Sequence, residues 1–365
     1  MTAGSIVTGT FPSVGDVGGH SVVMHYGHIA GEYAALRTSA MLVDRSARGR
    51  VRIAGDKAPE LVTGLVTNDV IALQPGHGQY AAALNPKGKI VADVRIFRFD
   101  EHLLIDTPPR AHAGWLALVR KYVNPRLAPY RDESSAIRDL GVFGLQSRRI
   151  VSEITGLTGD VLASLGPYAH ARALLDAETS VDVARVPDLQ LEGYEVFVPQ
   201  SAYAGLWQRA LVAGAIPAGL LAWEIARVEA GRPEWGLDID ESTIPQEANL
   251  DELHAISYTK GCYVGQEVVA RVHFRGHVNR HLRGIRCGHH EPPPEHAALL
   301  DEAGKQVGDV RTSALSPRLG AIALAMVRRE VAPGATLRVQ SPPPASPDPH
   351  AEVQAELFAL PFPLD

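Results

Sequence analysis

The chain has 365 residues, a length that predicts two or three domains of roughly 100–150 residues each. Apolar residues make up 45% and charged residues 21% of the sequence, which is typical of a folded globular protein. The net charge of −6 disfavours binding to phosphate backbones, so we expect no nucleic-acid partner. The apolar stretches are far shorter than the roughly 20 residues of a membrane span, so we expect no membrane partner either.

Two cysteines, Cys262 and Cys287, are present. The polar, glycine-rich start has no charged-then-apolar pattern of a secretory signal, and we therefore expect a cytoplasmic protein. An all-thiolate iron–sulphur cluster takes four protein sulphurs, and the sequence has no C-x-x-C pair. These counts predict that the chain holds no metal of its own.

The N-terminal third alternates strand and helix patterns. Residues 40–55 predict a strand that ends at Gly55, and Asp56 is the expected N-cap of the helix that follows. Residues 79–99 predict a hairpin with its turn at 85–88. Alternation along the return strand places Asp93 on a strand face, where Arg95 is available to pair with it.

The middle of the chain continues in the same way. A helix is expected at 111–122, a strand at 140–146, a helix at 147–157 and a helix at 220–229. A strand at 192–199 places Tyr194 and Glu195 on opposite faces. This mixture predicts an α+β fold and not a doubly wound parallel sheet.

The residue pattern changes near residue 281. From there on, short β-like runs are separated by glycine and proline. We predict a first region at 1–280, a small β-barrel domain at 281–340 and a proline-rich, mobile tail at 341–365.

The densest set of reactive residue types surrounds Cys262. Two glycines free the backbone near this cysteine, and Lys260 together with a following helix start would favour its thiolate. The alternative is a small buried filler, because free cysteine is among the most buried residue types. Cys262 and Lys260 are therefore candidate catalytic residues.

This run reads K-G-C-Y-V-G-Q-E and continues V-V-A-R-V-H-F-R-G, a pattern that resembles the YgfZ type of the glycine-cleavage T-protein superfamily. Further segments are similar to the same superfamily: D-R-S-A-R-G-R-V-R-I-A-G, R-V-E-A-G, D-I-D-E-S-T-I-P-Q-E-A, V-G-D-V-R-T-S-A and L-G-A-I-A-L-A-M-V. Together they span roughly residues 21–339.

The resemblance implies three domains in a ring around a central folate site, with residues 1–280 forming two interleaved α+β subdomains and a small C-terminal β barrel closing the ring. It implies tetrahydrofolate or a derivative as cofactor. Glu195 matches the glutamate that holds the pterin, and the alternative for it is an exposed strand carboxylate. Asp93 matches the catalytic aspartate and is also expected at the cofactor. Tyr194, Arg227 and Gln266 are the further cofactor-binding residues implied.

Some positions depart from the transferase pattern. Ala92 replaces the first aspartate of a paired motif, and Trp223 stands where T-proteins carry an arginine. We therefore expect a folate-binding accessory protein that uses Cys262 in the assembly or repair of iron–sulphur enzymes, with transient iron–sulphur client or assembly partners. The alternative is a tetrahydrofolate-dependent aminomethyltransferase or other one-carbon transferase. A third interpretation is a folate-sensing regulator in which Cys262 is structural.

Overall fold

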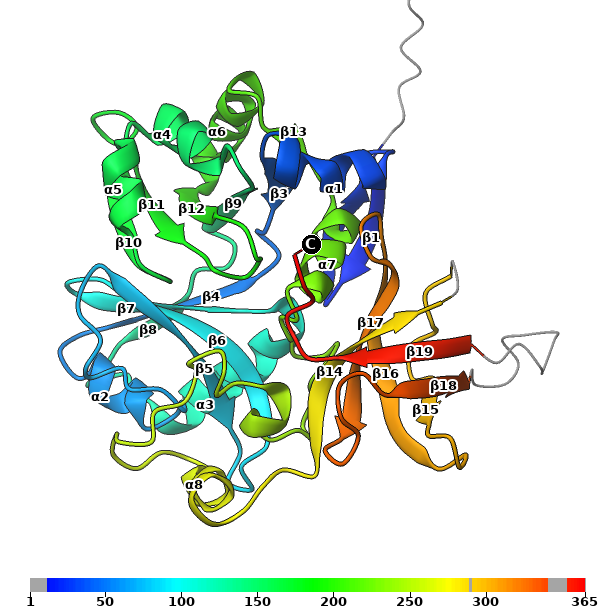
Figure 1. The fold of residues 1–365 in the computed structure, drawn as a ribbon. Helices are drawn as coiled ribbons and strands as arrows, with labels where there is room; N and C mark the ends of the chain where they lie inside the picture. Colours follow the sequence, from blue (N-terminus) through cyan, green and yellow to red (C-terminus); the bar gives the residue numbers. More distant parts are fainter. Residues whose placement is uncertain (1–11, 289–290, 341–352, 365) are drawn as a thin grey trace, which may run out of the picture.

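The structure is a computed structural model that describes residues 12–288, 291–340 and 353–364. Two lobes, each a sheet covered by helices, and a closed barrel lie around the helix α7 (Leu220–Glu229), as Figure 1 shows. The predicted α+β class with a small C-terminal barrel is confirmed.

The first lobe has a six-stranded sheet in the order β10-β11-β12-β9-β3-β13. Its helices pack with apolar side chains such as Ile150 and Leu206 against sheet residues such as Val142 and Val196. The elements are β3 (Met41–Asp44), β9 (Ile137–Phe143), α4 (Ser147–Thr155), α5 (Gly159–Ser164), β10 (His170–Leu174), β11 (Ser180–Arg185), β12 (Gly193–Pro199), α6 (Gln200–Val212) and β13 (Ile216–Pro217).

The second lobe has a five-stranded sheet in the order β5-β6-β7-β4-β8. Its core contains Trp115, which is fully buried beside strand residues such as Val94 and Ile96. The elements are β4 (Gly49–Ala54), α2 (Ala58–Thr63), β5 (His77–Leu84), β6 (Ile90–Arg98), β7 (His102–Thr107), η1 (Pro109–Ala111), α3 (His112–Tyr122) and β8 (Tyr130–Asp132). The expected Asp56 cap is wrong: Lys57 is the N-cap of α2 and makes no side-chain cap bond.

The chain crosses between the two lobes twice. Strand β3 belongs to the first sheet and β4 to the second, so residues 45–48 cross from one lobe to the other. The chain returns between β8 and β9. The crossing segment carries Arg45 and Arg48, and the fold thereby places both arginines between the lobes.

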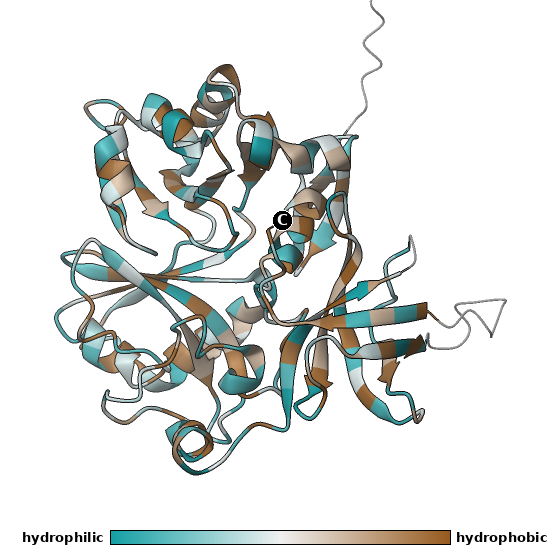
Figure 2. Cartoon of the chain, viewed as in Figure 1, coloured by the Kyte–Doolittle hydropathy of each residue, from teal (hydrophilic) through white to brown (hydrophobic). Residues whose placement is uncertain are grey.

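The barrel closes in the order β14-β17-β16-β15-β18-β19. Hydrophobic and hydrophilic residues alternate along its strands, as Figure 2 shows, because one face lines the barrel interior. The strands are β14 (Arg280–Cys287), β15 (Ala298–Leu300), β16 (Gln306–Ser316), β17 (Gly320–Arg328), β18 (Thr336–Gln340) and β19 (Val353–Phe358).

The prediction of a mobile tail at 341–365 is wrong for its second half. Strand β19 pairs with both β14 and β18 and completes the barrel. Beyond it, Phe362 is buried, and its backbone N–H donates to the carbonyl of Glu229 at 3.0 Å. Residues 341–352 and 365 lie outside the described residues.

The remaining elements surround α7 and the second lobe. The hairpin β1–β2 and the helix α1 contact α7, and α8 follows the cysteine-containing loop. None of the helices in the described ranges is long and apolar enough to cross a membrane. These elements are β1 (Ser13–Val17), β2 (His20–His25), α1 (Ile29–Thr38), η2 (Pro245–Ala248) and α8 (Gln266–Arg275).

Candidate active site

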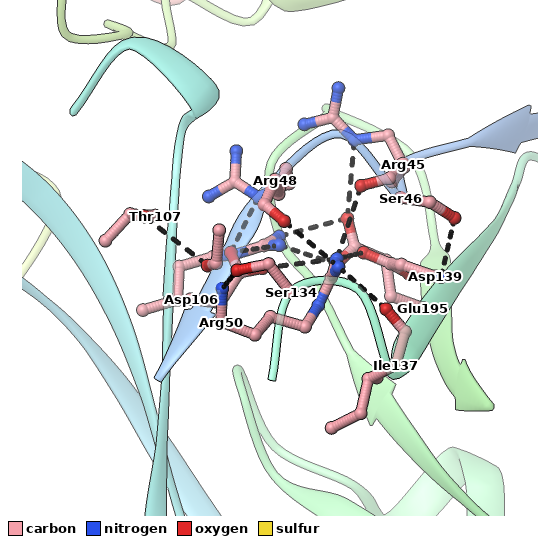
Figure 3. A network of polar contacts seen from close by, with 12 residues as sticks. Arg45, Ser46, Arg48, Arg50, Asp106, Thr107, Ser134, Ile137, Asp139 and Glu195 are labelled. Atoms are coloured by element: carbon pink, nitrogen blue, oxygen red, sulfur yellow. Dashed lines mark hydrogen bonds and ion pairs between the residues drawn. The ribbon is translucent and has the colours of Figure 1, made fainter. Parts of the chain in front are cut away.

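A buried network of arginines and carboxylates joins the two lobes (Figure 3). Asp106 of β7 accepts from Arg48 Nε at 2.6 Å and from Arg95 Nε at 2.8 Å. Arg50, fully buried, pairs through Nη2 with Asp139 of the other lobe at 2.7 Å. Burial opposes ionisation of Asp106, but the positive charges of Arg48, Arg95 and Arg50 outweigh it and hold its pKa below the ordinary value.

Glu195, the expected pterin ligand, lies inside this network. Its carboxylate is fully buried and accepts two bonds from Arg95, with Nη1–Oε1 at 3.0 Å and Nη2–Oε2 at 2.6 Å. This bidentate geometry is the strongest form of an arginine–carboxylate pair. Glu195 is therefore neither an exposed strand carboxylate nor a free ligand for a pterin edge.

Asp93 lies on the same face of β6 as Arg95, but the two residues do not pair, so that expectation is wrong. The Asp93 carboxylate instead accepts from the Tyr80 hydroxyl at 3.0 Å and from the Trp235 backbone N–H at 3.2 Å. Burial raises the pKa of Asp93 to about 6, although the charge of Arg48 opposes the shift. A carboxyl with a pKa near the working pH can take up or release a proton there.

Asp93 faces a small inner cavity between the lobes. The space open to the centre of a water molecule is about 20 Å³. The cavity therefore has room for about one water. Five arginines line this cavity: Arg45, Arg48, Arg95, Arg227 and Arg232. In this conformation the residues present do not fit a pterin held by Glu195, because the cavity is too small and the carboxylate is already paired.

A larger outer cavity adjoins the inner one and shares Arg45, Arg48 and Glu234 with it. By the same measure its volume is about 240 Å³. Its wall combines charged residues with apolar side chains of the hairpin β1–β2 and of α7. The small cavity that Asp93 lines is therefore next to a larger one.

Two of the other expected cofactor residues are engaged in structural contacts. Tyr194 points away from Glu195, into the helix-covered core, and its hydroxyl donates to the Leu162 carbonyl at 3.1 Å. Arg227 borders the inner cavity, but it pairs with Asp238 at 2.5 Å and with Glu224 at 2.7 Å.

The cysteine loop lies apart from both cavities. Neither Cys262, Lys260 nor Gln266 lines either of them. Cys262 is exposed, whereas Cys287 is buried and burial raises its pKa to about 11. Gln266 begins α8, so the helix starts four residues after the cysteine and not at it.

Lys260 does not point toward the neighbouring thiol. Its Nζ donates to the backbone carbonyls of Thr63 and Val66 at 2.5 Å each and of Asn68 at 3.0 Å. Burial lowers the pKa of this amine to about 8. Lys260 thus ties the cysteine loop to the end of α2, as a lysine that caps the final carbonyls of a helix does.

The sequence interpretation missed the arginine cluster. Four arginines, Arg45, Arg48, Arg50 and Arg52, follow β3 within eight residues and alternate with small or apolar residues. That density of cations at the end of a buried strand was the available signal, because buried arginines require partners or a ligand.

Two sheet lobes and a barrel around a buried central carboxylate define a ring-shaped protein of the T-protein class. Comparison with known families gives the same result: residues 11–257 match the GCVT N-terminal domain, and residues 280–357 match the glycine cleavage T-protein C-terminal barrel domain. The chain belongs to the glycine cleavage T-protein family.

Individual relatives are similar over nearly the whole chain. An aminomethyltransferase of Rubrobacter xylanophilus is 31% identical over 353 residues, covering 95% of this chain and 89% of the relative. One of Saccharopolyspora erythraea is 29% identical, covering 94% and 92%. The crystal structure of the glycine cleavage system aminomethyltransferase T from Bartonella henselae has the same fold, with a TM-score of 0.86 at 20% identity over 97% of this chain and 95% of that one.

Proposed function

We propose that this protein is a one-carbon transferase of the aminomethyltransferase type in which Asp93 is the proton-handling group. The observation that carries the proposal is the position of Asp93, buried at the centre of a T-protein fold and held by Tyr80 and Trp235. Its raised pKa suits a carboxyl that orients an amine and exchanges one proton with it. The names of the relatives, aminomethyltransferase, support the same reaction class.

Tetrahydrofolate is the acceptor that we propose on the family resemblance. A reduced folate supplies the nucleophilic nitrogens that take up a one-carbon unit. Because Glu195 is paired with Arg95, we assign no contact to the pterin and derive no step through it. The protein's own contribution is the buried carboxyl of Asp93 at an inner cavity with room for only about one water.

The test is formation of methylenetetrahydrofolate from an aminomethyl donor by wild type and by Asp93→Asn. We expect turnover by wild type and a loss of about 100-fold or more in the variant, since general acid–base groups contribute on this scale. Calorimetric titration with tetrahydrofolate on both proteins separates binding from chemistry. Equal turnover by Asp93→Asn, or none by wild type, would contradict the proposal.

A second candidate function rests on the exposure of Cys262. We propose it as the chemically active group of an accessory protein for iron–sulphur enzymes, acting on client or assembly proteins that bind transiently. An exposed thiol beside Gly261 and before α8 is accessible to a protein partner. The two candidates use separate parts of the molecule, because Cys262 borders neither cavity.

Complementation distinguishes the two functions. Cells lacking the protein are given wild type, Cys262→Ser, Cys287→Ser or Asp93→Asn at matched expression, and iron–sulphur enzyme activity is measured. The accessory role predicts loss with Cys262→Ser alone, with Cys287→Ser as the matched control. Full rescue by Cys262→Ser would remove this second candidate and leave its thiol without a role in that process.

A further inference from the structure

The crossing segment at 45–48 carries two arginines whose outer nitrogens have no hydrogen-bond partner among the described residues. Arg45 is 7% exposed, and its side chain donates no hydrogen bond to any residue in the described ranges. Its nearest acid is Glu195, at 3.7 Å from Nε, and that carboxylate is already bound by Arg95. Arg48 uses Nε for Asp106, and its two terminal nitrogens likewise bond to no described residue.

These two cations also oppose each other electrostatically. Burial lowers the pKa of Arg45, and the charge of Arg48 lowers it further. The Arg45 guanidinium nevertheless has a fixed position, because it lies over the Trp223 ring at 4.0 Å from the centroid. A desolvated cation beside a like charge is unfavourable for folding, so a ligand anion would supply what the protein itself does not.

Both arginines line the outer cavity as well as the inner one. Figure 3 shows their terminal nitrogens extending away from the acids of the network. The cavity wall beyond them is apolar on two sides, from the hairpin β1–β2 and from α7 and the loop after it. Those apolar residues are Val17, Val22, Met24, Leu220, Leu221 and Leu237.

Several carboxylates also reach this wall, but the central ones have partners of their own. Glu224 accepts from Arg227 at 2.7 Å, and Glu234 lies 3.5 Å from Arg110. Asp44 accepts from the backbone N–H of Ser46 at 2.8 Å. Asp16 and Glu295 also line the cavity, but both are exposed to solvent, and Asp16 accepts from the Gly19 backbone N–H at 3.1 Å. The buried charge that has no hydrogen-bond partner of its own next to the apolar walls is therefore positive.

We propose that the outer cavity is a binding site for a small molecule with a carboxylate or phosphate head group, held by Arg45 and Arg48, and an apolar body packed between β1–β2 and α7. Planar guanidinium groups suit either oxyanion, since both present paired oxygens. A cavity of about 240 Å³ suits a body of one aromatic ring or a short alkyl chain. The site requires no folate, and it goes beyond the proposed transfer reaction.

The experiment is calorimetric titration of the full-length protein, without folate, using four probes. Benzoate and phenyl phosphate carry the two head groups on one ring, inorganic phosphate carries the head group alone, and benzyl alcohol is the neutral control. We expect benzoate or phenyl phosphate to bind at least about tenfold more tightly than benzyl alcohol, because each charge-assisted bond contributes that much. The ratio of the two aromatic anions identifies the preferred head group, and weak binding of inorganic phosphate would show that the apolar body contributes.

Arg45→Met is the decisive variant. It should lose at least about tenfold in affinity for the anionic probe while its melting temperature stays equal to or above that of wild type, since the Arg45 side chain donates no hydrogen bond to any described residue and its backbone bonds remain in the variant. Arg48→Gln should also lose affinity, with lower stability because its bond to Asp106 is lost. Arg172→Gln, which removes an exposed arginine paired with Asp182 on β11, is the matched control and should bind the probes as wild type does.

Three outcomes would overturn the proposal. Equal binding of benzoate, phenyl phosphate and benzyl alcohol would remove the anion site, as would unchanged affinity in Arg45→Met. A strongly destabilised or unfolded Arg45→Met would show that Arg45 serves the fold and not a ligand. Failure of tetrahydrofolate to bind, together with success of these probes, would overturn the proposed cofactor while leaving this site intact.

Discussion

Glu195 and Arg95, one hundred residues apart in sequence, face each other across the lobe interface with two hydrogen bonds of 3.0 and 2.6 Å. The Arg95 side chain is 2% exposed, and the Glu195 side chain is fully buried. The pair joins β12 of the first lobe to β6 of the second. We therefore expect Glu195 to contribute mainly to the stability of the folded protein.

We predict that Glu195→Ala destabilises the protein by roughly 3 kcal/mol in the absence of any ligand, because it leaves Arg95 buried with fewer partners. The measurement is the free energy of unfolding from a urea titration. Asp182→Ala removes a carboxylate from an exposed arginine pair and should change stability by less than about 1 kcal/mol. A Glu195→Ala protein as stable as wild type would mean that Arg95 needs only its other acids.

The raised pKa of Asp93 leads to a second prediction, which concerns how the stability of the fold depends on pH. The folded-state pKa of about 6 lies above the ordinary 3.8, so the folded state binds this proton more tightly than the unfolded chain does. Stability is then lost as pH rises from about 4 through 6, and the full difference is roughly 3 kcal/mol above pH 6. Asp93→Asn removes this dependence.

The free energies of unfolding of wild type and Asp93→Asn should therefore be similar near pH 4 and diverge toward pH 7, with the variant the more stable. Urea titrations at pH 4, 5, 6 and 7 measure the difference. Parallel curves for the two proteins across this range would show that Asp93 is not the group responsible.

The two thiols should react very differently with iodoacetamide. Cys262 is exposed, and Cys287 is buried inside the barrel with a pKa raised to about 11. Since the thiolate is the reactive form, the native protein should take up one label per chain near neutral pH, and the second only after denaturation. Mass spectrometry counts the labels, and native Cys262→Ser should take up none; a labelled Cys287 in that variant would show that the barrel opens.

Regular patterns in the sequence predicted most of the fold. Alternation in 282–339 identified the barrel strands, and helical spacing with Gly231 beyond it gave the bounds of α7. Strand β19 was missed because the proline-rich residues before it dominate the composition, although Val353, Ala355 and Leu357 alternate as a strand should.

The site was harder to predict because its contacts are long-range. Alternation placed Glu195 on the face opposite Tyr194, which the structure shows, but nothing local reveals a partner in another sheet. Asp93 was found through its register with a known motif, whereas its partner Trp235 lies 142 residues away. Lys260 is close to Cys262 in sequence, but this closeness was equally misleading. The side chain of Lys260 points to the backbone carbonyls of residues 63–68.

The direction of the Lys260 side chain gives the last prediction. If this lysine activated the thiol, Lys260→Met would slow alkylation of Cys262 markedly. In the structure its Nζ instead satisfies the carbonyls of Thr63, Val66 and Asn68, which would be left without this donor in the variant. We therefore expect Lys260→Met to lose roughly 2–4 kcal/mol of unfolding free energy, on the scale of several hydrogen bonds, one of them partly exposed.

Alkylation should be compared under conditions where both proteins remain folded, with the rate for Cys262 followed by mass spectrometry at neutral pH. We expect rates within about twofold of each other, since the lysine amine points away from the sulphur. Lys57→Met serves as the control, because among the described residues that exposed lysine pairs with Glu60 alone, and its loss should leave both stability and alkylation unchanged. A tenfold slower reaction in Lys260→Met, with stability preserved, would instead assign Lys260 to the thiol and give the cysteine loop its own activating group.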